Sequence, residues 1–267
     1  MTSRTLEIIK KYDLSTKKKF GQNFLVDESL LDKIVSIAGN IKNKNILEIG
    51  PGPGGLTYSI LKQNPKKLIS IEIDTDLEKI LKIEFENYKN FEVINCDALK
   101  INEKQFFDGN INIIANLPYN VGTTLLIKWL NNIKIFDSFT LLLQKEVVDR
   151  IVAEPKTKDY GRLTILVQAL CEAKKAFDVK PTFFLPPPKV VSSVVHIVPK
   201  KNIENINIEK LSKITQQLFS NRRKKIKKAM EDLVKNKIIS SKALNIVDLD
   251  KRAEELTVEE FVNLSKL

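Results

Sequence analysis

The sequence predicts an α/β protein in which a doubly wound, mostly parallel sheet is followed by a small all-helical domain. Short apolar runs rich in Ile and Val alternate with helical patterns as far as Leu143, and from Glu209 onward only helical patterns occur. Alternating strands and helices form βαβ units. Because the parallel strands of such units are buried on both faces, they form nearly continuous apolar runs in a sequence.

The expected elements follow one another in the order typical of this fold class. Strands are expected at residues 44–50, 67–73, 91–96, 111–115 and 139–143, and helices at 56–61, 77–87 and 123–130. The remaining expected elements are a helix at 163–170 and a closing pair of strands at 173–179 and 190–198.

Two irregular segments divide the later part of the chain. Residues 181–189, between the closing strands, are too rich in proline to be regular. Residues 200–210 are polar and turn-like, and they mark a boundary. We therefore expect one domain over residues 1–200 and a helical domain over residues 201–267.

The composition is typical of a soluble globular protein, with 43% hydrophobic and 29% charged residues in a chain of 267. The 44 Lys and Arg residues outnumber the 33 Asp and Glu residues, which gives a formal net charge of +11. A surplus of this size favours a polyanionic partner, with nucleic acid ahead of an acidic membrane. The alternative is a basic surface without a specific partner, because a lysine-rich composition produces one as well.

The cysteines and the N-terminal segment indicate the compartment. Cys96 and Cys171 lie far apart and have no metal-binding spacing, as expected in a reducing compartment. The N-terminal segment is charged and lacks the apolar stretch of about 7–15 residues that signal peptides contain. No run approaches the roughly 18 apolar residues of a membrane span. We therefore expect a cytoplasmic protein with no membrane partner and no bound metal.

A glycine-rich loop follows the first expected strand and begins a helix. Gly50, Gly52 and Gly55 match the pattern G-x-G-x-x-G, which is a weak signal when it stands alone. Such a loop lets backbone N–H groups approach a ligand closely. An acid expected about 20 residues further on is present as Glu72, at the end of the second strand, where a carboxylate can accept hydrogen bonds from ribose hydroxyls.

Two further acids favour S-adenosylmethionine over NAD as the ligand of this loop. Glu48 lies two residues before the first glycine, as in the first motif of class I methyltransferases. Asp97 directly follows the third strand and fits an acceptor for the adenine amino group. Either acid could simply cap a helix. However, Gly52, Asp97 and Asn116 all lie at strand ends, where open parallel sheets bind ligands.

The tetrapeptide N-L-P-Y, residues 116–119, follows the fourth strand and suits methylation of the exocyclic amine of adenine. The lone pair of that amine is delocalised into the ring, so the amine is a poor nucleophile. The side-chain carbonyl of Asn116 and the backbone carbonyl of Leu117 can accept hydrogen bonds from its N–H groups. Pro118 fixes the backbone, and Tyr119 can stack on a base that has left its own stack. The remaining task is alignment of the reacting atoms, which requires neither a metal nor a strong general base.

A series of motifs along nearly the whole chain resembles one known family. The motifs are KKKFGQNFLVD (residues 17–27), ILEIGPGPGGLT, IEID, NCDAL, NLPYNVGTTLL, FFLPPPKVVSSVV, LFSNRRKKIKKAM and KRAEELTVEEF. They resemble those of the bacterial ribosomal RNA small subunit methyltransferase A (16S rRNA adenine dimethyltransferase) family. DNA adenine methyltransferases more often have proline where this chain has Leu117.

The resemblance implies a Rossmann-like class I S-adenosylmethionine-dependent methyltransferase domain with an RNA- or ribosome-binding C-terminal domain. It also implies that Asn23 and Leu25 contact the cofactor, along with Gly50 and Asn116. Phe184 would stack on the target adenine opposite Tyr119. The spacing F-x-P-P-P-K-V selects Phe184, although the adjacent Phe183 stays open as the stacking residue.

The reaction that the resemblance implies is dimethylation of two adjacent adenines at N6, in the hairpin loop near the 3′ end of 16S rRNA. Four molecules of S-adenosyl-L-methionine would each donate one methyl group and leave S-adenosyl-L-homocysteine. The partner would be 16S rRNA within the immature small ribosomal subunit, late in 30S biogenesis. The sequence gives no sign of oligomerisation, so we expect a monomer.

A run of cations, R-R-K-K-I-K-K, lies in the expected helical domain. Its six charged residues are Arg222, Arg223, Lys224, Lys225, Lys227 and Lys228. On a helix they would spread around most of the circumference, so part of the set would face solvent. A solvated face is the usual explanation of such runs, but beside an expected RNA site we favour contacts with phosphates. Lys17 to Lys19 are further candidates for RNA contact.

Two alternative functions remain open from the sequence. The first is the sister family that dimethylates one large-subunit rRNA adenine and confers macrolide resistance, against which the C-terminal motifs argue. The second is a non-catalytic protein of this fold, such as a ribosome-assembly factor or a mitochondrial transcription factor. Such a protein could lose Asn116 or Glu72, and both are present.

Overall fold

The computed structural model describes residues 3–17, 21–201 and 206–267. They form two compact units, Met1–Val148 with Lys174–Val198, and Asp149–Ala173 with Pro199–Leu267. The second junction agrees with the expected boundary near residue 200. The segment Asp149–Ala173, however, was expected in the first domain, and it belongs to the second unit. Its helix α7 (Arg162–Leu170) packs against two helices that follow the boundary, α8 (Ile208–Phe219) and α10 (Val258–Lys266).

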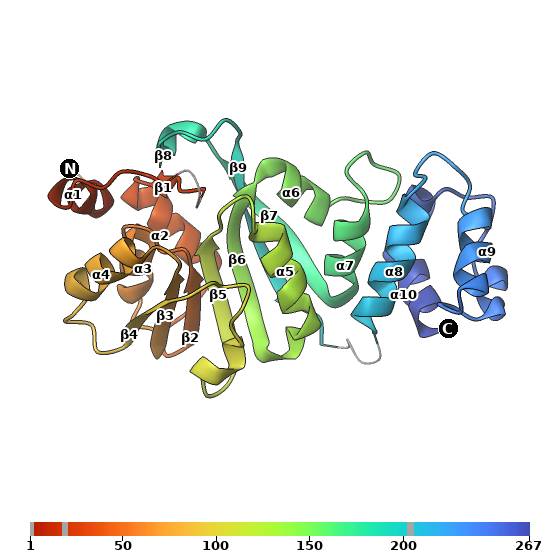
Figure 1. Ribbon diagram of the computed structural model, residues 1–267, viewed down its shortest axis with the longest axis horizontal. Coiled ribbons are helices and arrows are strands. Elements are labelled where there is room, and N and C mark those ends of the chain that lie inside the picture. The colour runs from red at the N-terminus through yellow and green to blue at the C-terminus, as the bar shows by residue number, and fades with distance from the viewer. Residues whose placement is uncertain (1–2, 18–20, 202–205) are drawn as a thin grey trace. The chain divides into compact units, whose positions relative to one another are not determined.

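The first unit is built around a seven-stranded sheet with the order β4-β3-β2-β5-β6-β9-β7 (Figure 1). The strands are β2 (Asn45–Ile49), β3 (Lys67–Glu72), β4 (Phe91–Asn95), β5 (Ile111–Asn116), β6 (Phe136–Gln144), β7 (Cys171–Val179) and β9 (Ser192–Pro199). The pairs from β4 through β6 are parallel, and β9 pairs with β6 in the antiparallel direction. The predicted α/β class with a mostly parallel sheet is therefore confirmed.

Helices cover both faces of this sheet. Ile46, Leu68 and Ile114 belong to a buried cluster that also contains side chains of α2 (Glu28–Ile37), α3 (Gly55–Leu61) and α4 (Thr75–Glu84). On the opposite face, Trp129 of α5 (Gly122–Asn131) stacks on Phe139 of β6, with ring centroids 5.7 Å apart. Burial of each large apolar side chain stabilises the fold by about 1.5–3 kcal/mol. The helices packed on the two faces of the sheet therefore hold the strands, and the loops at the strand ends, in place.

Several short elements lie outside the predicted set. They are α1 (Arg4–Lys11), β1 (Phe24–Leu25), α2, η2 (Glu103–Phe106), η3 (Ile133–Ile135), α6 (Lys145–Ile151), η4 (Pro181–Phe183) and β8 (Phe184–Leu185). Strands β1 and β8 pair in the antiparallel direction over two residues each. A two-residue strand is too short to produce a periodic pattern, so the sequence could not reveal this pair.

The second unit has its own aromatic core. Phe219 of α8 stacks on Phe261 of α10 at 5.9 Å, and Tyr160 packs on Phe219 at 6.4 Å. The Tyr160 hydroxyl donates a hydrogen bond of 2.8 Å to the carbonyl of Leu256. Its other elements are α9 (Lys227–Lys235), η5 (Ser241–Asn245) and η6 (Ala253–Glu255). Residues 202–205 of the expected turn-like segment lie outside the described residues. Among the residues that the structure describes, no helix is both long and apolar enough to cross a membrane.

The loop between β2 and α3 requires glycine at Gly54. Its φ is +90°, and a Cβ atom there would lie 2.5 Å from a ring carbon of Phe85 and 2.8 Å from a methyl carbon of Leu81. Gly39 also has a positive φ, +72°, but a Cβ there would meet nothing within 4 Å. A side chain at position 39 would therefore introduce backbone strain alone, whereas one at position 54 would add steric overlap with the core.

We expect Gly54→Ala to destabilise the first unit by about 2–4 kcal/mol, because left-handed strain and overpacking of a core add up. Gly39→Ala serves as the control and should cost only about 1–2 kcal/mol, since it carries the strain alone. Urea unfolding of both variants measures the difference. Equal losses of unfolding free energy would show that the Phe85 and Leu81 contacts do not matter.

Candidate active site

The carboxyl ends of strands β2 to β5 surround a cavity of about 190 Å³ in the first unit. A single water needs only about 10–15 Å³ of such space, so the cavity can hold a ligand of many atoms. Its position is the one predicted from the strand ends. The predicted site residues that line it are Asn23, Leu25, Gly50, Gly52, Glu72, Asp97, Asn116, Leu117, Pro118 and Tyr119.

Glu72 is the buried acid of this cavity, with 4% of its surface exposed. Its Oε2 accepts a hydrogen bond of 3.2 Å from the Gly52 N–H, and its Oε1 accepts one of 2.9 Å from the Asp74 N–H. Burial raises the pKa of Glu72 to about 7, although these hydrogen bonds oppose the shift. A carboxylate offers about four acceptor positions, so Glu72 can still accept from a ligand hydroxyl.

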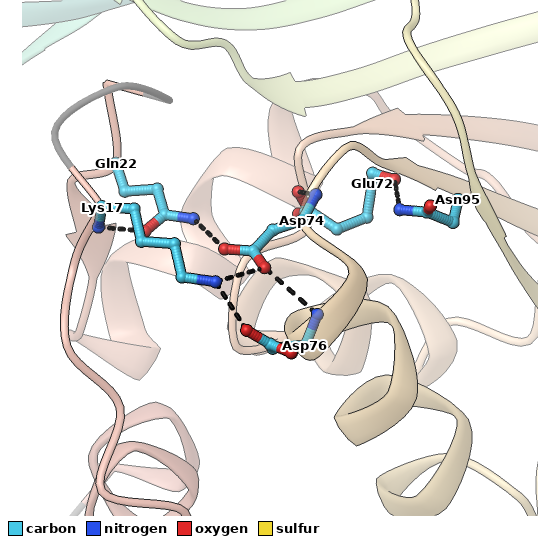
Figure 2. A network of polar contacts seen from close by, with 6 residues as sticks. All are labelled: Lys17, Gln22, Glu72, Asp74, Asp76 and Asn95. Atoms are coloured by element: carbon cyan, nitrogen blue, oxygen red, sulfur yellow. Dashed lines mark hydrogen bonds and ion pairs between the residues drawn. The ribbon is translucent and has the colours of Figure 1, made fainter.

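The loop after Glu72 is tied to the N-terminal segment, as Figure 2 shows. The Lys17 ammonium forms ion pairs with Asp74 at 2.8 Å and with Asp76 at 2.6 Å. Lys17 therefore already has two carboxylate partners, which argues against the RNA contact expected for it. Lys18 and Lys19 lie outside the described residues.

Asn116 ends β5 with its side chain in a defined orientation. Its Nδ2 donates a hydrogen bond of 3.3 Å to the backbone carbonyl of Asn23, which leaves Oδ1 as the acceptor. The Pro118 carbonyl accepts hydrogen bonds from the N–H groups of Val121 and Gly122, at 3.1 and 3.0 Å. This turn begins α5, so the Pro118 carbonyl is already used within the fold.

Leu117 and Tyr119 are held by contacts on either side of the same turn. The Leu117 N–H donates a hydrogen bond of 3.2 Å to the Leu142 carbonyl, and its side chain is buried. The Tyr119 hydroxyl lies 2.6 Å from the Ser192 hydroxyl. Burial raises the pKa of Tyr119, and the hydrogen bond with Ser192 opposes this only in part. Tyr119 is therefore neutral at physiological pH, with its ring held at the cavity.

The Asp97 loop is held by a lysine that was not predicted as part of the site. Lys128 of α5 donates hydrogen bonds to the carbonyls of Ala98 and Ile101, at 2.8 and 2.7 Å, and pairs with Glu103 at 2.8 Å. Helix α5 therefore supports both N-L-P-Y and the loop that contains Asp97. The signal in the sequence was a single cation within the otherwise uncharged run GTTLLIKWL.

Glu48 lies beneath the glycine loop and does not line the cavity. Its Oε2 accepts hydrogen bonds from the hydroxyls of Thr57 and Ser70, at 2.7 and 2.6 Å. Burial raises the pKa of Glu48 to about 7. These partners lie in α3 and β3, so the contacts give Glu48 the role of holding that helix to the sheet.

A family model described as "Ribosomal RNA adenine dimethylase" matches residues 13–267. The chain belongs to this family. The protein named ribosomal RNA small subunit methyltransferase A of Ehrlichia ruminantium (strain Gardel) is 45% identical over 260 residues, which cover 95% of this chain and 97% of that protein. Its namesake from Wolbachia pipientis subsp. Culex pipiens (strain wPip) is 42% identical over 263 residues, which cover 96% of this chain and 98% of that protein.

Solved structures of similar proteins support this family assignment. A dimethyladenosine transferase from Plasmodium falciparum superposes with a TM-score of 0.76 at 29% identity, covering 90% of this chain and 95% of that one. The 23S rRNA methyltransferase ErmE superposes with a TM-score of 0.69 at 24% identity, covering 91% and 98%. At that identity ErmE shows the fold alone. The fold is that of class I S-adenosylmethionine-dependent methyltransferases, as predicted.

Phe184 is the predicted site residue of this dimethylase that does not line the cavity. It lies in β8 opposite Leu25 of β1, is 3% exposed and belongs to the buried core, whereas Leu185 faces outward and is 41% exposed. Phe184 is therefore buried in this structure and does not line the cavity, and its stacking opposite Tyr119 stays a prediction. Phe183, the alternative, is partly buried against the same core. Successive strand residues point to opposite faces, and spacing alone could not tell which face Phe184 takes.

The basic run of the dimethylase is a turn over residues 222–226, and the predicted helix is wrong there because α9 begins only at Lys227. The Arg222 guanidinium pairs with Glu254 at 2.5 Å and donates to two backbone carbonyls of the same unit. Lys225 pairs with Asp250 at 2.7 Å. The other four cations are exposed, namely Arg223, Lys224, Lys227 and Lys228.

Within residues 3–17, 21–201 and 206–267, no three side chains of His, Cys, Asp or Glu gather as a metal site would require.

The pKa of Glu72 predicts pH-dependent cofactor binding in this dimethylase. Hydroxyl donors bind a carboxylate better than a protonated carboxyl group, so affinity should rise as Glu72 ionises. Between pH 6 and pH 8 we expect the affinity for S-adenosylhomocysteine to increase roughly ten-fold, as the ionised fraction of a group with a pKa near 7 does. Calorimetry at several pH values measures this.

Glu72→Gln, which cannot ionise, should bind more weakly and without this pH dependence. Glu48→Gln is the matched control, because Glu48 has a similar pKa but does not line the cavity. It should keep the pH dependence, with the midpoint moved to lower pH because the two acids repel one another when both are ionised. A wild-type affinity that stays constant between pH 6 and pH 8 would exclude Glu72 ionisation as a factor in binding.

Proposed function

We propose that the protein transfers methyl groups from S-adenosylmethionine to N6 of two adjacent adenines in the 3′-terminal hairpin loop of 16S rRNA, within the immature small subunit. The observation that carries this proposal is the arrangement of Asn116. Its Oδ1 is left as an acceptor at the cavity that also contains Glu72 and Gly52. An adenine amine needs such an acceptor, and a cofactor with a ribose needs such an acid.

The residues of the cavity fit S-adenosylmethionine. Glu72 can still accept hydrogen bonds from ribose hydroxyls, and Gly50 and Gly52 have no side chains to keep a ligand from the backbone. Asp97 would accept from the adenine amino group, while Asn23 and Leu25 would contact the cofactor from the N-terminal segment. When bound, S-adenosylmethionine supplies an electrophilic methyl group on a positively charged sulfur.

On the substrate side, two carbonyl groups would hold the amine. The Asn116 side-chain oxygen would accept one N–H and the Leu117 backbone carbonyl the other, because the Pro118 carbonyl already accepts two hydrogen bonds. Holding both hydrogens favours a more tetrahedral nitrogen and returns its lone pair to the reaction. Tyr119 would stack on the extruded base. This arrangement supplies position rather than acid or base catalysis.

The small subunit is favoured over the large one by the relatives that share 42–45% identity over nearly the whole chain, all named small subunit methyltransferases. The exposed cations of the second unit support an RNA substrate through phosphate contacts, which position RNA without reading its sequence. We therefore propose that much of the selectivity comes from the assembling subunit, and that the protein acts as a monomer.

The function is tested by tritium transfer from S-adenosylmethionine to small subunits purified from a strain that lacks this modification. We expect Asn116→Ala to reduce methyl transfer by roughly 10²-fold or more, as loss of a group that acts in the transition state does. Its affinity for S-adenosylhomocysteine should change little, because Glu72 and the glycine loop remain. Primer extension on both rRNAs locates the product. Modification of the large-subunit rRNA alone would refute the proposal.

The basic run predicts the salt dependence of RNA binding. Each lost phosphate contact lowers the slope of log affinity against log salt by roughly 0.7–0.9. Replacing four of the five exposed cations of the run by Gln should therefore make the slope for binding to small subunits shallower by up to about 3–4. The substituted residues are Arg223, Lys224, Lys227 and Lys228.

A matched control removes the same charge elsewhere. It replaces exposed lysines near the amino ends of the sheet strands, away from the cavity, which are Lys42, Lys44, Lys104 and Lys134. The control should keep the wild-type slope. Equal slopes in the two quadruple variants would show that net charge, rather than this run, governs RNA binding.

A further inference from the structure

A polar network beside the cofactor acid joins two segments that lie far apart in the chain (Figure 2). The Gln22 side-chain amide donates a hydrogen bond of 3.1 Å to Asp74. Its oxygen accepts one of 2.7 Å from the Lys17 backbone N–H, and the Lys17 ammonium pairs with the other Asp74 oxygen at 2.8 Å. The three residues therefore form a closed set of contacts.

Asp74 is the centre of this network. Only 3% of its surface is exposed, and its backbone N–H donates a hydrogen bond of 2.9 Å to Glu72. Its side chain also caps α4 by accepting the Asp76 N–H at 3.1 Å. Burial opposes ionisation of Asp74, but the hydrogen bonds from Lys17 and Gln22 outweigh it and hold its pKa below the usual value. Asp74 is therefore a charged anchor at neutral pH.

The segment anchored through Gln22 makes two contacts at the cavity. The carbonyl of the next residue, Asn23, accepts the hydrogen bond that orients Asn116. The ring of Phe24 covers Gly52 so closely that a Cβ there would lie 3.0 Å from it. Any movement of Gln22 would therefore reach both the target-base acceptor and the glycine loop.

We infer that Asp74 and Gln22 are positioning residues: they hold residues 21–24 against the cavity and thereby fix the Asn116 oxygen where the adenine amine must lie. The consequence for methyl transfer rests on the proposed function, whereas the positioning of the segment does not. Neither residue needs to touch the cofactor or the RNA for this role. The hydrogen bond from Gln22 to Asp74 is the contact through which Asp74 holds this segment in place.

Two variants break this link from opposite sides. Asp74→Ser keeps a good N-cap for α4, since serine caps helices about as well as aspartate, but it loses both partners. Gln22→Ala leaves Asp74 as the cap and paired with Lys17. One control is Asp32→Ser on helix α2, which removes the ion pair between Asp32 and Lys62. The other is Gln63→Ala, at an exposed position after α3. None of these control residues lines the cavity.

In the cofactor-free protein, we expect both variants to speed hydrogen exchange of the amides of residues 23–26 by about ten-fold, because local opening becomes easier. Calorimetry at pH 8 or above, where Glu72 is mostly ionised with or without the Asp74 charge, should show affinity for S-adenosylhomocysteine reduced about three- to ten-fold. Turnover at saturating substrates should fall about ten-fold through misplacement of Asn116. The double variant should lose no more than Asp74→Ser alone, since that variant already removes the link to Gln22. The melting temperature of Gln22→Ala should match its control.

Wild-type exchange and affinity in both variants would overturn the inference. An effect of Asp74→Ser without one of Gln22→Ala would also overturn it, because the loss would then come from the Glu72 loop alone. If exchange rises in both variants while the wild type methylates no rRNA, the positioning stands and the proposed function fails. Loss of melting temperature with unchanged turnover would assign Asp74 a purely structural role.

Discussion

The cavity depends on the hydrogen bonds that the buried carboxyl group of Glu72 accepts. It accepts the Gly52 N–H from the loop after β2 and the Asp74 N–H from the loop after β3. Burying a carboxylate is costly unless such hydrogen bonds compensate. Here the compensation is incomplete, and the pKa of about 7 records it. A ligand that supplies further donors would therefore stabilise the ionised form of Glu72.

The same loops connect the side of the cavity proposed for the cofactor with the side proposed for the target base. From Glu72 the contacts continue through Asp74 and Gln22 to Asn23, whose carbonyl orients Asn116. A second connection runs through α5, where Lys128 holds the loop after β4. Methyl transfer by alignment requires both ligands in register, and rigid elements place groups more accurately than independent loops. These contacts give the loops that rigidity.

Much of the fold and of the cavity could be predicted because one rule governs both. Buried parallel strands form apolar runs, and their carboxyl ends meet at one edge, so Glu72, Asp97 and Asn116 could be assigned to one cavity. Other features depend on tertiary contacts that leave no local pattern. The face taken by Phe184 follows from a two-residue pairing with β1, and Lys128 matters only because α5 packs beside the loop after β4.

Residues 149–173 belong to the second unit and contact the basic run through Arg222. The backbone carbonyls of Thr157 and Lys158 accept hydrogen bonds from the Arg222 guanidinium, which also pairs with Glu254. Arg222 therefore holds the turn in place, although 39% of its side chain is exposed, and the exposed cations beyond it lie in the same turn and at the start of α9. A phosphate contact made by a fixed cation loses less side-chain and backbone entropy than one made by a flexible tail. If the run binds RNA as proposed, the pairing of Arg222 would let its neighbours contact phosphates with a smaller loss of entropy.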